Sequence, residues 1–189
     1  RGTMALVTCT PERYEIAGRF DVPKGGEGMY WAHPVVCGGR LYVLDAGNHM
    51  VRRIDRDGVV STLAGIAGKQ GAQDGPVAQA TFNNPTSIAL ADGDAVLVAD
   101  WGNGTIRRIE KGQVTTLMRT YFEGEEATSK ACHCGGLRPY RISMGPDRAI
   151  WFLTFDADRV FRMSGAGIAQ AVVGTAGSRG YRGHALPGS

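Results

Sequence analysis

The feature of this chain that most constrains its fold is an internal repeat. Residues 41–54 align with residues 96–109, 55 positions further on, and the alignment pairs Asp45 with Asp100. Residues 151–163 form a third copy, 54 positions after the second, with Thr154 at the place of the aspartate. Self-similarity at a fixed period of tens of residues indicates one supersecondary unit that stacks on its neighbours.

Each copy contains four short β-like runs that glycine-rich turns separate, which is the pattern of consecutive hairpins. The expected strands are 35–37, 41–44, 50–55 and 59–63 in the first copy, 86–90, 95–99, 105–110 and 113–117 in the second, and 141–144, 150–153, 159–163 and 168–173 in the third. Four antiparallel strands, repeated with a longer link, describe a blade of a β-propeller. We therefore expect residues 34–173 to be nearly all β, with no helix longer than two turns.

The strand count predicts an incomplete propeller. Residues 5–10 and 14–20 have the pattern of the last two strands of a preceding blade. About three and a half blades are then present, whereas closed propellers have at least about four. We expect an open arc, which is a fragment of a longer protein. The expected divisions are the end of a preceding blade with its link at 1–29, and blades with links at 30–83, 84–137 and 138–189.

Composition limits the classes of function. The 189 residues carry a net charge of +3, which is too small to indicate nucleic-acid binding. No run of 18 apolar residues is present, so no membrane-spanning helix is expected. Four cysteines are few for this length, and a disulfide framework is not expected. The sequence does not identify the compartment, and secreted and periplasmic locations stay open.

The second copy contains Asn84-Pro85-Thr86-Ser87-Ile88-Ala89 and the run from Val98 to Ile109 with its Asp100-Trp101-Gly102-Asn103-Gly104 turn. These segments resemble the NHL repeat closely. The first copy contains Asn48-His49, the pair in the family name, and residues 63–85 are similar to the long inter-blade links of bacterial NHL proteins. The resemblance covers roughly residues 30 to 183 and implies a β-propeller fold. It says little about function, because one architecture serves many activities.

Two segments depart from the NHL pattern. The third copy has Phe155-Asp156-Ala157-Asp158 as its turn, and with Gly145-Pro146-Asp147 and Trp151-Phe152 it partly resembles streptogramin-lyase propellers. Residues 30–42 partly resemble quinoprotein-type propellers. The NHL-like amidating lyases use a histidine-ligated metal, but His33, His49 and His184 match no such set.

One face of the propeller is the expected binding site. Turns between second and third strands share a face with the links that leave each fourth strand, and the links at 65–84 and 119–138 are each near 20 residues long. Long connections in a compact fold are usually functional or disordered. The candidate binding residues on this face are Asn48, His49, Trp101, Asn103, Phe155, Asp156 and Tyr181.

Two other groups of residues are candidate sites. Asp45 and Asp100 precede glycine-containing turns, where a carboxylate can accept backbone N–H bonds, so we expect a structural role rather than ligand contact. Cys132, His133 and Cys134 could suit zinc, but a fourth ligand is not identified. We therefore expect no bound metal there, and either incidental thiols or a redox pair.

The sequence thus favours a binding scaffold, without a cofactor, that recognises a protein, a glycan or a small ligand. The alternatives are a propeller lyase or hydrolase with a metal-assisted site, and a quinone-dependent oxidoreductase. An enzyme would need acid, base or metal groups that converge from several blades. Each blade packs between two neighbours, so the terminal blades are expected to recruit missing blades or to self-associate.

Overall fold

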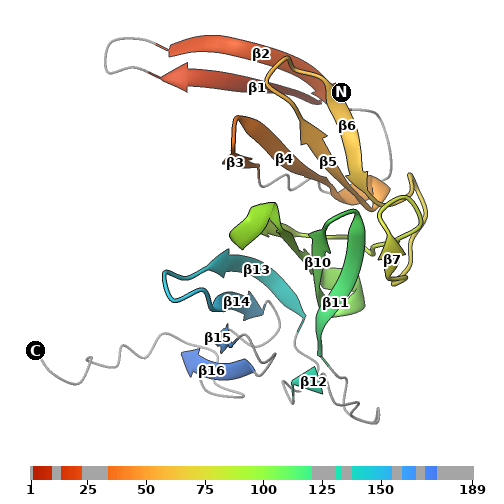
Figure 1. Cartoon of the computed structure of the whole chain (residues 1–189), viewed down its shortest axis with the longest axis vertical. Coiled ribbons are helices and arrows are strands. Elements are labelled where there is room, and N and C mark those ends of the chain that lie inside the picture. The colour runs from red at the N-terminus through yellow and green to blue at the C-terminus, as the bar shows by residue number, and fades with distance from the viewer. Residues whose placement is uncertain are drawn as a thin grey trace, which may run out of the picture.

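A computed structural model shows an arc of antiparallel sheets (Figure 1). The structure describes residues 2–9, 14–22, 34–120, 131–132, 138–154, 159–164 and 169–173. Within these ranges the helical segments are three single 3-10 turns of three residues each, η1, η2 and η3. None of the described helices is long and apolar enough to cross a membrane. The prediction of a nearly all-β chain that forms an open arc of blades is confirmed.

Three sheets of the arc contain the expected four-stranded blades. Blade 1 consists of β3 (Val35–Cys37), β4 (Arg40–Asp45), β5 (Met50–Ile54) and β6 (Val60–Ala64). Blade 2 consists of β8 (Ser87–Leu90), β9 (Val96–Asp100), β10 (Thr105–Glu110) and β11 (Gln113–Thr120). Blade 3 consists of β13 (Pro139–Met144), β14 (Ile150–Thr154), β15 (Arg159–Met163) and β16 (Ala169–Val173). Strands pair in chain order in each blade, and the observed bounds lie within three residues of the expected ones.

Four further strands complete the described set. β1 (Gly2–Cys9) and β2 (Tyr14–Val22) pair as an antiparallel hairpin, where the sequence predicted two strands of a preceding blade. β7 (Gly75–Pro76) lies in the link that follows blade 1, and it pairs with β11, the outermost strand of blade 2. β12 (Ala131–Cys132) pairs with the far end of the same strand. The edge of blade 2 is therefore partly covered by backbone from both links.

Alternation along β9 explains how the blades stack. Val96 and Val98 belong to a buried cluster with Tyr42 and Val51 of blade 1. Leu97 lies in a second cluster, with residues of blade 3. Successive side chains of a strand point to opposite faces of its sheet. Blade 2 therefore has an apolar layer on each face.

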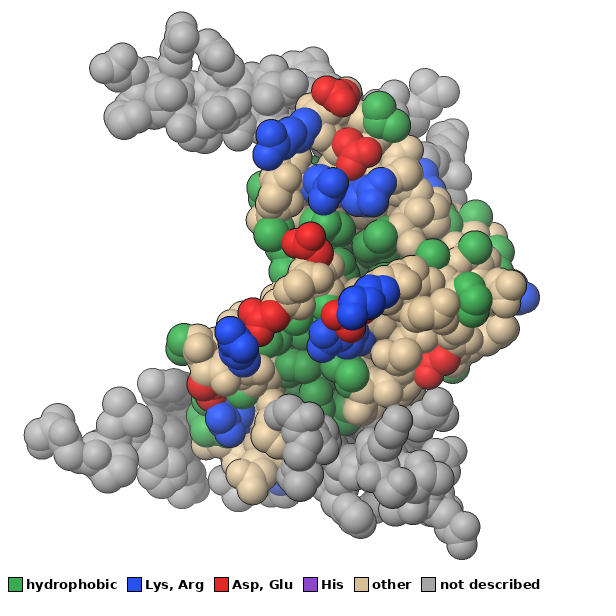
Figure 2. All heavy atoms as spheres, in the orientation of Figure 1, with side chains coloured by type: hydrophobic (Ala, Val, Ile, Leu, Met, Phe, Trp, Pro, Cys, Tyr) green, Lys and Arg blue, Asp and Glu red, His purple; other side chains and the backbone are tan. Residues whose placement is uncertain are grey.

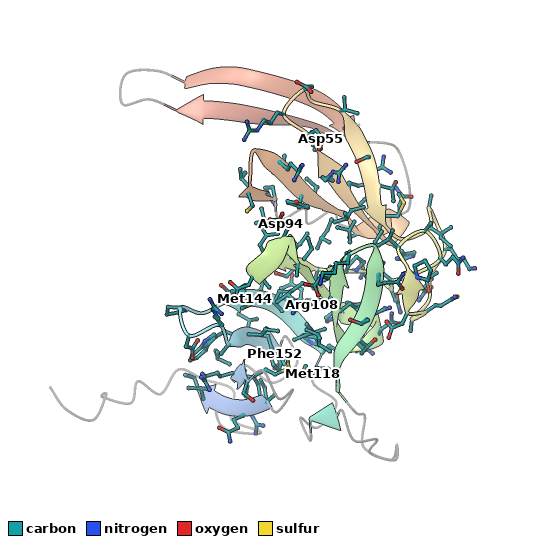
Figure 3. The ribbon with its side chains drawn as sticks, viewed as in Figure 1. Asp55, Asp94, Arg108, Met118, Met144 and Phe152 are labelled. Carbon is teal, nitrogen blue, oxygen red and sulfur yellow. The ribbon has the colours of Figure 1, made fainter. Side chains whose placement is uncertain are left out.

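The layer between blades 2 and 3 is closely packed. Met118 from β11 and Phe152 from β14 belong to this one cluster and are labelled in Figure 3. The rings of Phe152 and Phe161 stack, with centroids 5.1 Å apart and planes 9° from parallel. The Ser87 hydroxyl of blade 2 accepts a hydrogen bond from the Ile142 N–H of blade 3 at 3.1 Å. Apolar contact and a buried hydrogen bond together fix the relative position of these two blades.

Candidate functional site

The turns between second and third strands repeat from blade 1 to blade 2. η1 (Ala46–Asn48) follows Asp45, and η3 (Trp101–Asn103) follows Asp100. His49 and Gly104 end these turns in the left-handed conformation, with φ of 58° and 61°. Asn48 donates to Asp45 at 2.9 Å and Asn103 donates to Asp100 at 2.7 Å, so both turns are closed by an Asp–Asn pair.

The link between blades 1 and 2 is held to both of them. Asn103 Nδ2 also donates to the carbonyl of Gly71 at 2.7 Å, and Nδ1 of His49 accepts the Asn84 N–H at 3.0 Å. The Val77 N–H donates to Gly112 O in the turn between β10 and β11, at the other end of the blade. The link therefore lies beside the turns η1 and η3, as expected, but it also extends along the outer edge of blade 2.

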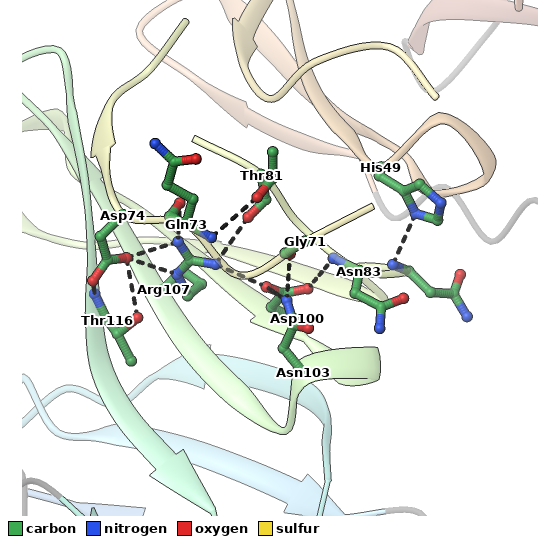
Figure 4. A network of polar contacts seen from close by, with 11 residues as sticks. His49, Gly71, Gln73, Asp74, Thr81, Asn83, Asp100, Asn103, Arg107 and Thr116 are labelled. Carbon is green, nitrogen blue, oxygen red and sulfur yellow. Dashed lines mark hydrogen bonds and ion pairs between the residues drawn. The ribbon is translucent and has the colours of Figure 1, made fainter. Parts of the chain in front are cut away.

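Arg107 forms the centre of this arrangement (Figure 4). The side chain is fully buried, and its five N–H donors make five hydrogen bonds. Nε and Nη2 donate to Oδ1 of Asp74 at 3.1 and 2.7 Å, and Nη1 donates to Asp100 at 3.0 Å. The two remaining donors reach the carbonyls of Gln73 and Thr81 at 2.8 and 3.1 Å. We call Arg107, Asp74 and Asp100 the Arg107 anchor.

Both carboxylates of the Arg107 anchor have further partners. Asp74 accepts the backbone N–H and the hydroxyl of Thr116, each at 3.0 Å. Asp100 accepts the Asn83 N–H at 2.7 Å. Burial raises the pKa of Asp100 above its usual value, although the bonds from Asn83 and Asn103 and the charge of Arg107 oppose that rise. The anchor thus connects the link to blade 2 through Arg107, whose pair with Asp100 is buried within the blade and whose pair with Asp74 of the link is partly exposed.

The third strands of blades 1 and 2 each carry two consecutive arginines, Arg52-Arg53 and Arg107-Arg108. The second arginine of each pair lies on the opposite face of its sheet from the first, as alternation predicts. Arg108 is 3.1 Å from Glu110, and Arg53 is 3.3 Å from Asp55. Hydrogen bonds from Arg108 lower the pKa of Glu110 below its usual range. Figure 2 shows acidic and basic side chains interspersed along the arc. This surface carries no field of a single sign, and exposed pairs of this kind contribute little stability.

The predicted site residues fall into two groups. Asn48, His49 and Asn103 are committed to the turn and link contacts given above. Trp101 is half-buried, with the Arg138 guanidinium 4.9 Å from its ring centroid, and its indole N–H has no partner among the described residues. Phe155, Asp156 and Tyr181 lie outside the described residues, as do His133 and Cys134, and Cys132 is described by its backbone only.

Asp74, Thr81 and Thr116 were not predicted as site residues. The link motif around Asp74 was visible in the sequence, and so was the repeated arginine pair, but nothing in the spacing joined them. Among the described residues, no group of three or more His, Cys, Asp or Glu side chains is placed to hold a metal ion.

The fold defines this chain as β-propeller blades, and comparisons with known proteins agree. A structural-genomics protein of unknown function from Bacteroides thetaiotaomicron superposes with a TM-score of 0.61 at 16% identity, over 75% of this chain and 37% of that one. A streptogramin B lyase superposes with a TM-score of 0.56 at 14% identity, over 84% of this chain and 44% of that one. At these identities the likeness concerns the fold alone.

The family model of the NHL repeat matches residues 82–109, which include β8, β9 and most of β10. Residues 82–109 therefore form an NHL repeat within a β-propeller fold. A curated relative, the chloroplastic protein SUPPRESSOR OF QUENCHING 1 of Arabidopsis thaliana, is 35% identical over 107 residues. That match covers 52% of this chain and 10% of the plant protein, so the chain spans about a tenth of this relative.

Proposed function

We propose that this chain is a binding module that recognises a protein partner on the edge formed by η1, η3 and the link 65–85. One observation carries the proposal: Asp74, Asp100, Arg107 and His49 are engaged in contacts that hold the link. Asp100 and Asp74 each bind Arg107, and His49 accepts a backbone N–H. A catalytic acid or base needs access to a substrate proton, which these contacts restrict. NHL propellers generally mediate protein interactions, which favours a protein over a glycan or a small ligand.

The exposed part of the same edge is suited to contact a partner. Lys69 and Gln79 on the link are exposed, and Trp101 in η3 is half-buried. Tryptophan is enriched among the residues that dominate protein–protein binding energy. The link is also held in place by backbone bonds such as Gly71 N–H to Phe82 O at 3.0 Å. An ordered surface loses little conformational entropy when a partner binds.

Site-specific photocrosslinking in the source cells tests this proposal. A benzophenone amino acid at Lys69 or Gln79 should capture a defined partner, and a change of Trp101 to alanine should reduce the yield at least about tenfold, as expected for an interface anchor. The matched control is Asp57, an exposed residue in the turn at the opposite end of blade 1. Capture of the partner from Asp57 but not from Lys69 or Gln79 would place the interface at the opposite end of the blades and contradict the proposal.

An assay for turnover separates this function from the enzymatic alternatives. The purified chain should leave a streptogramin B antibiotic intact when the mixture is followed by mass spectrometry, with and without added divalent metal. Ring opening that depends on the chain would contradict a non-catalytic role. A quinone-dependent oxidoreductase would instead give dye reduction in the presence of the cofactor.

A further inference from the structure

Blade 1 repeats the three side chains that hold the link on blade 2. Asp45 corresponds to Asp100, and Arg52 corresponds to Arg107. In the strand registers Arg52 lies opposite Thr62, as Arg107 lies opposite Thr116, and a register shift immediately precedes each arginine. We call Asp45, Arg52 and Thr62 the blade 1 cluster.

The blade 1 cluster has unpaired polar atoms where the Arg107 anchor has partners. Oδ2 of Asp45 is buried and has no hydrogen-bond partner among the described residues, and Asp45 is only 5% exposed. Nε of Arg52 is also buried and finds no partner in the described part of the chain, whereas Nη1 of Arg52 donates to the hydroxyl of Thr62 at 2.6 Å. A buried polar atom without a partner destabilises the folded state, because it has lost its hydrogen bonds to water. The cluster would therefore gain from a ligand that supplies one donor and one acceptor.

Blade 2 shows which ligand supplies both groups. There the second oxygen of the aspartate accepts a backbone N–H, from Asn83. The arginine and the threonine both bind one carboxylate, from Asp74. Both groups belong to one polypeptide segment, which reaches from Gly71 to Asn83. A neutral glycan offers no carboxylate and sulfate offers no donor, and on blade 2 both groups come from a peptide, so a peptide with an acidic side chain fits best.

Blade 3 lacks this chemistry. Thr154 takes the place of the aspartate, and Phe161 takes the place of the arginine, where it stacks on Phe152. Neither replacement carries a charge, and Phe161 makes an apolar contact with Phe152 instead of an ion pair. In blade 2 the ion pair is bound by the link, and in blade 3 the pair has been replaced. Among the three described blades, blade 1 is therefore the one where a ligand could bind the aspartate and the arginine.

We propose that the blade 1 cluster is a docking site for an acidic polypeptide segment that binds as the link 71–83 binds on blade 2. Arg52 and Thr62 would bind a carboxylate, and Asp45 would accept a backbone N–H. The proposal rests on the function proposed above and names a ligand class for one part of that edge. It requires a segment with an aspartate in a Gln-Asp-Gly-Pro context, as at residues 73–76.

Fluorescence anisotropy with a labelled peptide tests the docking site. The peptide has the sequence of residues 70–84, and the protein is the full chain. We expect saturable binding that Arg52→Gln and Thr62→Val each weaken at least about tenfold, because each removes a bond to the carboxylate. A peptide with asparagine in place of Asp74 should bind the parent protein as weakly as the normal peptide binds these two variants. Arg53→Gln, the neighbouring arginine on the opposite face of the sheet, is the matched control and should bind as the parent does.

Several outcomes would overturn the docking site. Absence of saturable binding would overturn it. Equal losses in Arg52→Gln and Arg53→Gln would also do so, because the effect would not depend on the cluster. Circular dichroism melts of each variant show that a loss does not come from unfolding, and Thr62→Val is the variant least disturbing to the fold. Crosslinking from Lys69 is independent of the peptide assay, so it shows whether the wider function stands when the docking site fails.

Discussion

Arg107 and Asp74 are joined by an ion pair of 2.7 Å, although they are 33 residues apart and belong to different repeats of the sequence. Asp74 lies in the link that follows blade 1, whereas Arg107 lies on the third strand of blade 2. The guanidinium is fully buried, and the aspartate carboxylate remains partly exposed. Long-range contacts of this kind make the position of the link a property of the tertiary structure.

The first prediction concerns the stability of the Arg107 anchor. Arg107→Met should lower the free energy of unfolding by about 3–5 kcal/mol, because Asp100 would be left buried without its counter-charge. Arg108→Met is the matched control on the opposite face and should cost about 1 kcal/mol or less. Urea denaturation followed by tryptophan fluorescence measures both. Equal losses in the two variants would show that the buried pair does not hold the link.

The second prediction concerns the protonation of Asp100. NMR titration should place its pKa above the value of 3.8 for an unperturbed aspartate, because burial penalises the charged form. Folding then takes up a proton in the window between 3.8 and the raised pKa, so this group's contribution to stability is fully present below 3.8 and is lost as the pH rises through the raised value.

The same titration in the Arg107→Met variant gives a second readout. The pKa of Asp100 should rise further, since the charge and the hydrogen bond of Arg107 both lower it. An unchanged pKa in that variant would contradict the electrostatic role of Arg107. Asn103→Ala should shift the pKa upward as well, because it removes a hydrogen bond to the carboxylate.

The third prediction compares Gly65, at the start of the link, with Gly112, in the turn between β10 and β11 that the link contacts. Both Gly65 and Gly112 have positive φ, at 100° and 75°. A Cβ at Gly65 would lie 2.7 Å from the carbonyl oxygen of His49, whereas nothing lies within 4 Å of a Cβ at Gly112. Gly112→Ala should therefore lower the free energy of unfolding by only about 1 kcal/mol, the cost of holding alanine in the left-handed backbone conformation. Gly65→Ala should cost clearly more, since η1 must also move, and thermal melts of the two variants make the comparison.

The fourth prediction concerns the contact between blades 2 and 3. Ser87→Ala should destabilise the chain by about 1–3 kcal/mol, because the buried Ile142 N–H would lose its acceptor. Hydrogen exchange should increase first in β13, which contains Ile142. Ser143→Ala, at the exposed neighbour, should leave both quantities nearly unchanged.

The fifth prediction concerns self-association. Val36, Val172 and Val173 lie on the first strand of blade 1 and the last strand of blade 3, and they are 65%, 50% and 59% exposed. Exposed apolar strands of this kind favour pairing with another chain. Light scattering coupled to size exclusion should show a mass that rises with protein concentration. A monomer at all concentrations, with a cooperative melt, would contradict this prediction.

The repeat predicted the blades well because their pattern is local. Strands such as residues 105–110 and 159–163 were placed at their observed bounds, since alternation and glycine turns act over a few residues. The opposite directions of Arg107 and Arg108 follow from the same alternation.

The Arg107 anchor could not be derived in this way. It pairs an arginine on a strand with an aspartate in a link, and no periodic signal connects such positions. Asn48, His49 and Asn103 were proposed for ligand contact because they are polar and lie in turns. The structure shows each of them hydrogen-bonded within the turns or to the link, which sequence alone does not reveal. Sequence did predict the edge on which these contacts gather.

Because the link that follows blade 1 supplies partners to Arg107 of blade 2, it also determines which segment of the chain can be duplicated or transferred as a unit. A fragment that begins at residue 84 carries every strand of blade 2 but leaves Arg107 without Asp74, Gln73 and Thr81. A fragment that begins near Gly65 brings these partners with it. The transferable unit is therefore a link together with the blade that follows it. Grafting of a blade should succeed when the blade keeps the link on its amino-terminal side.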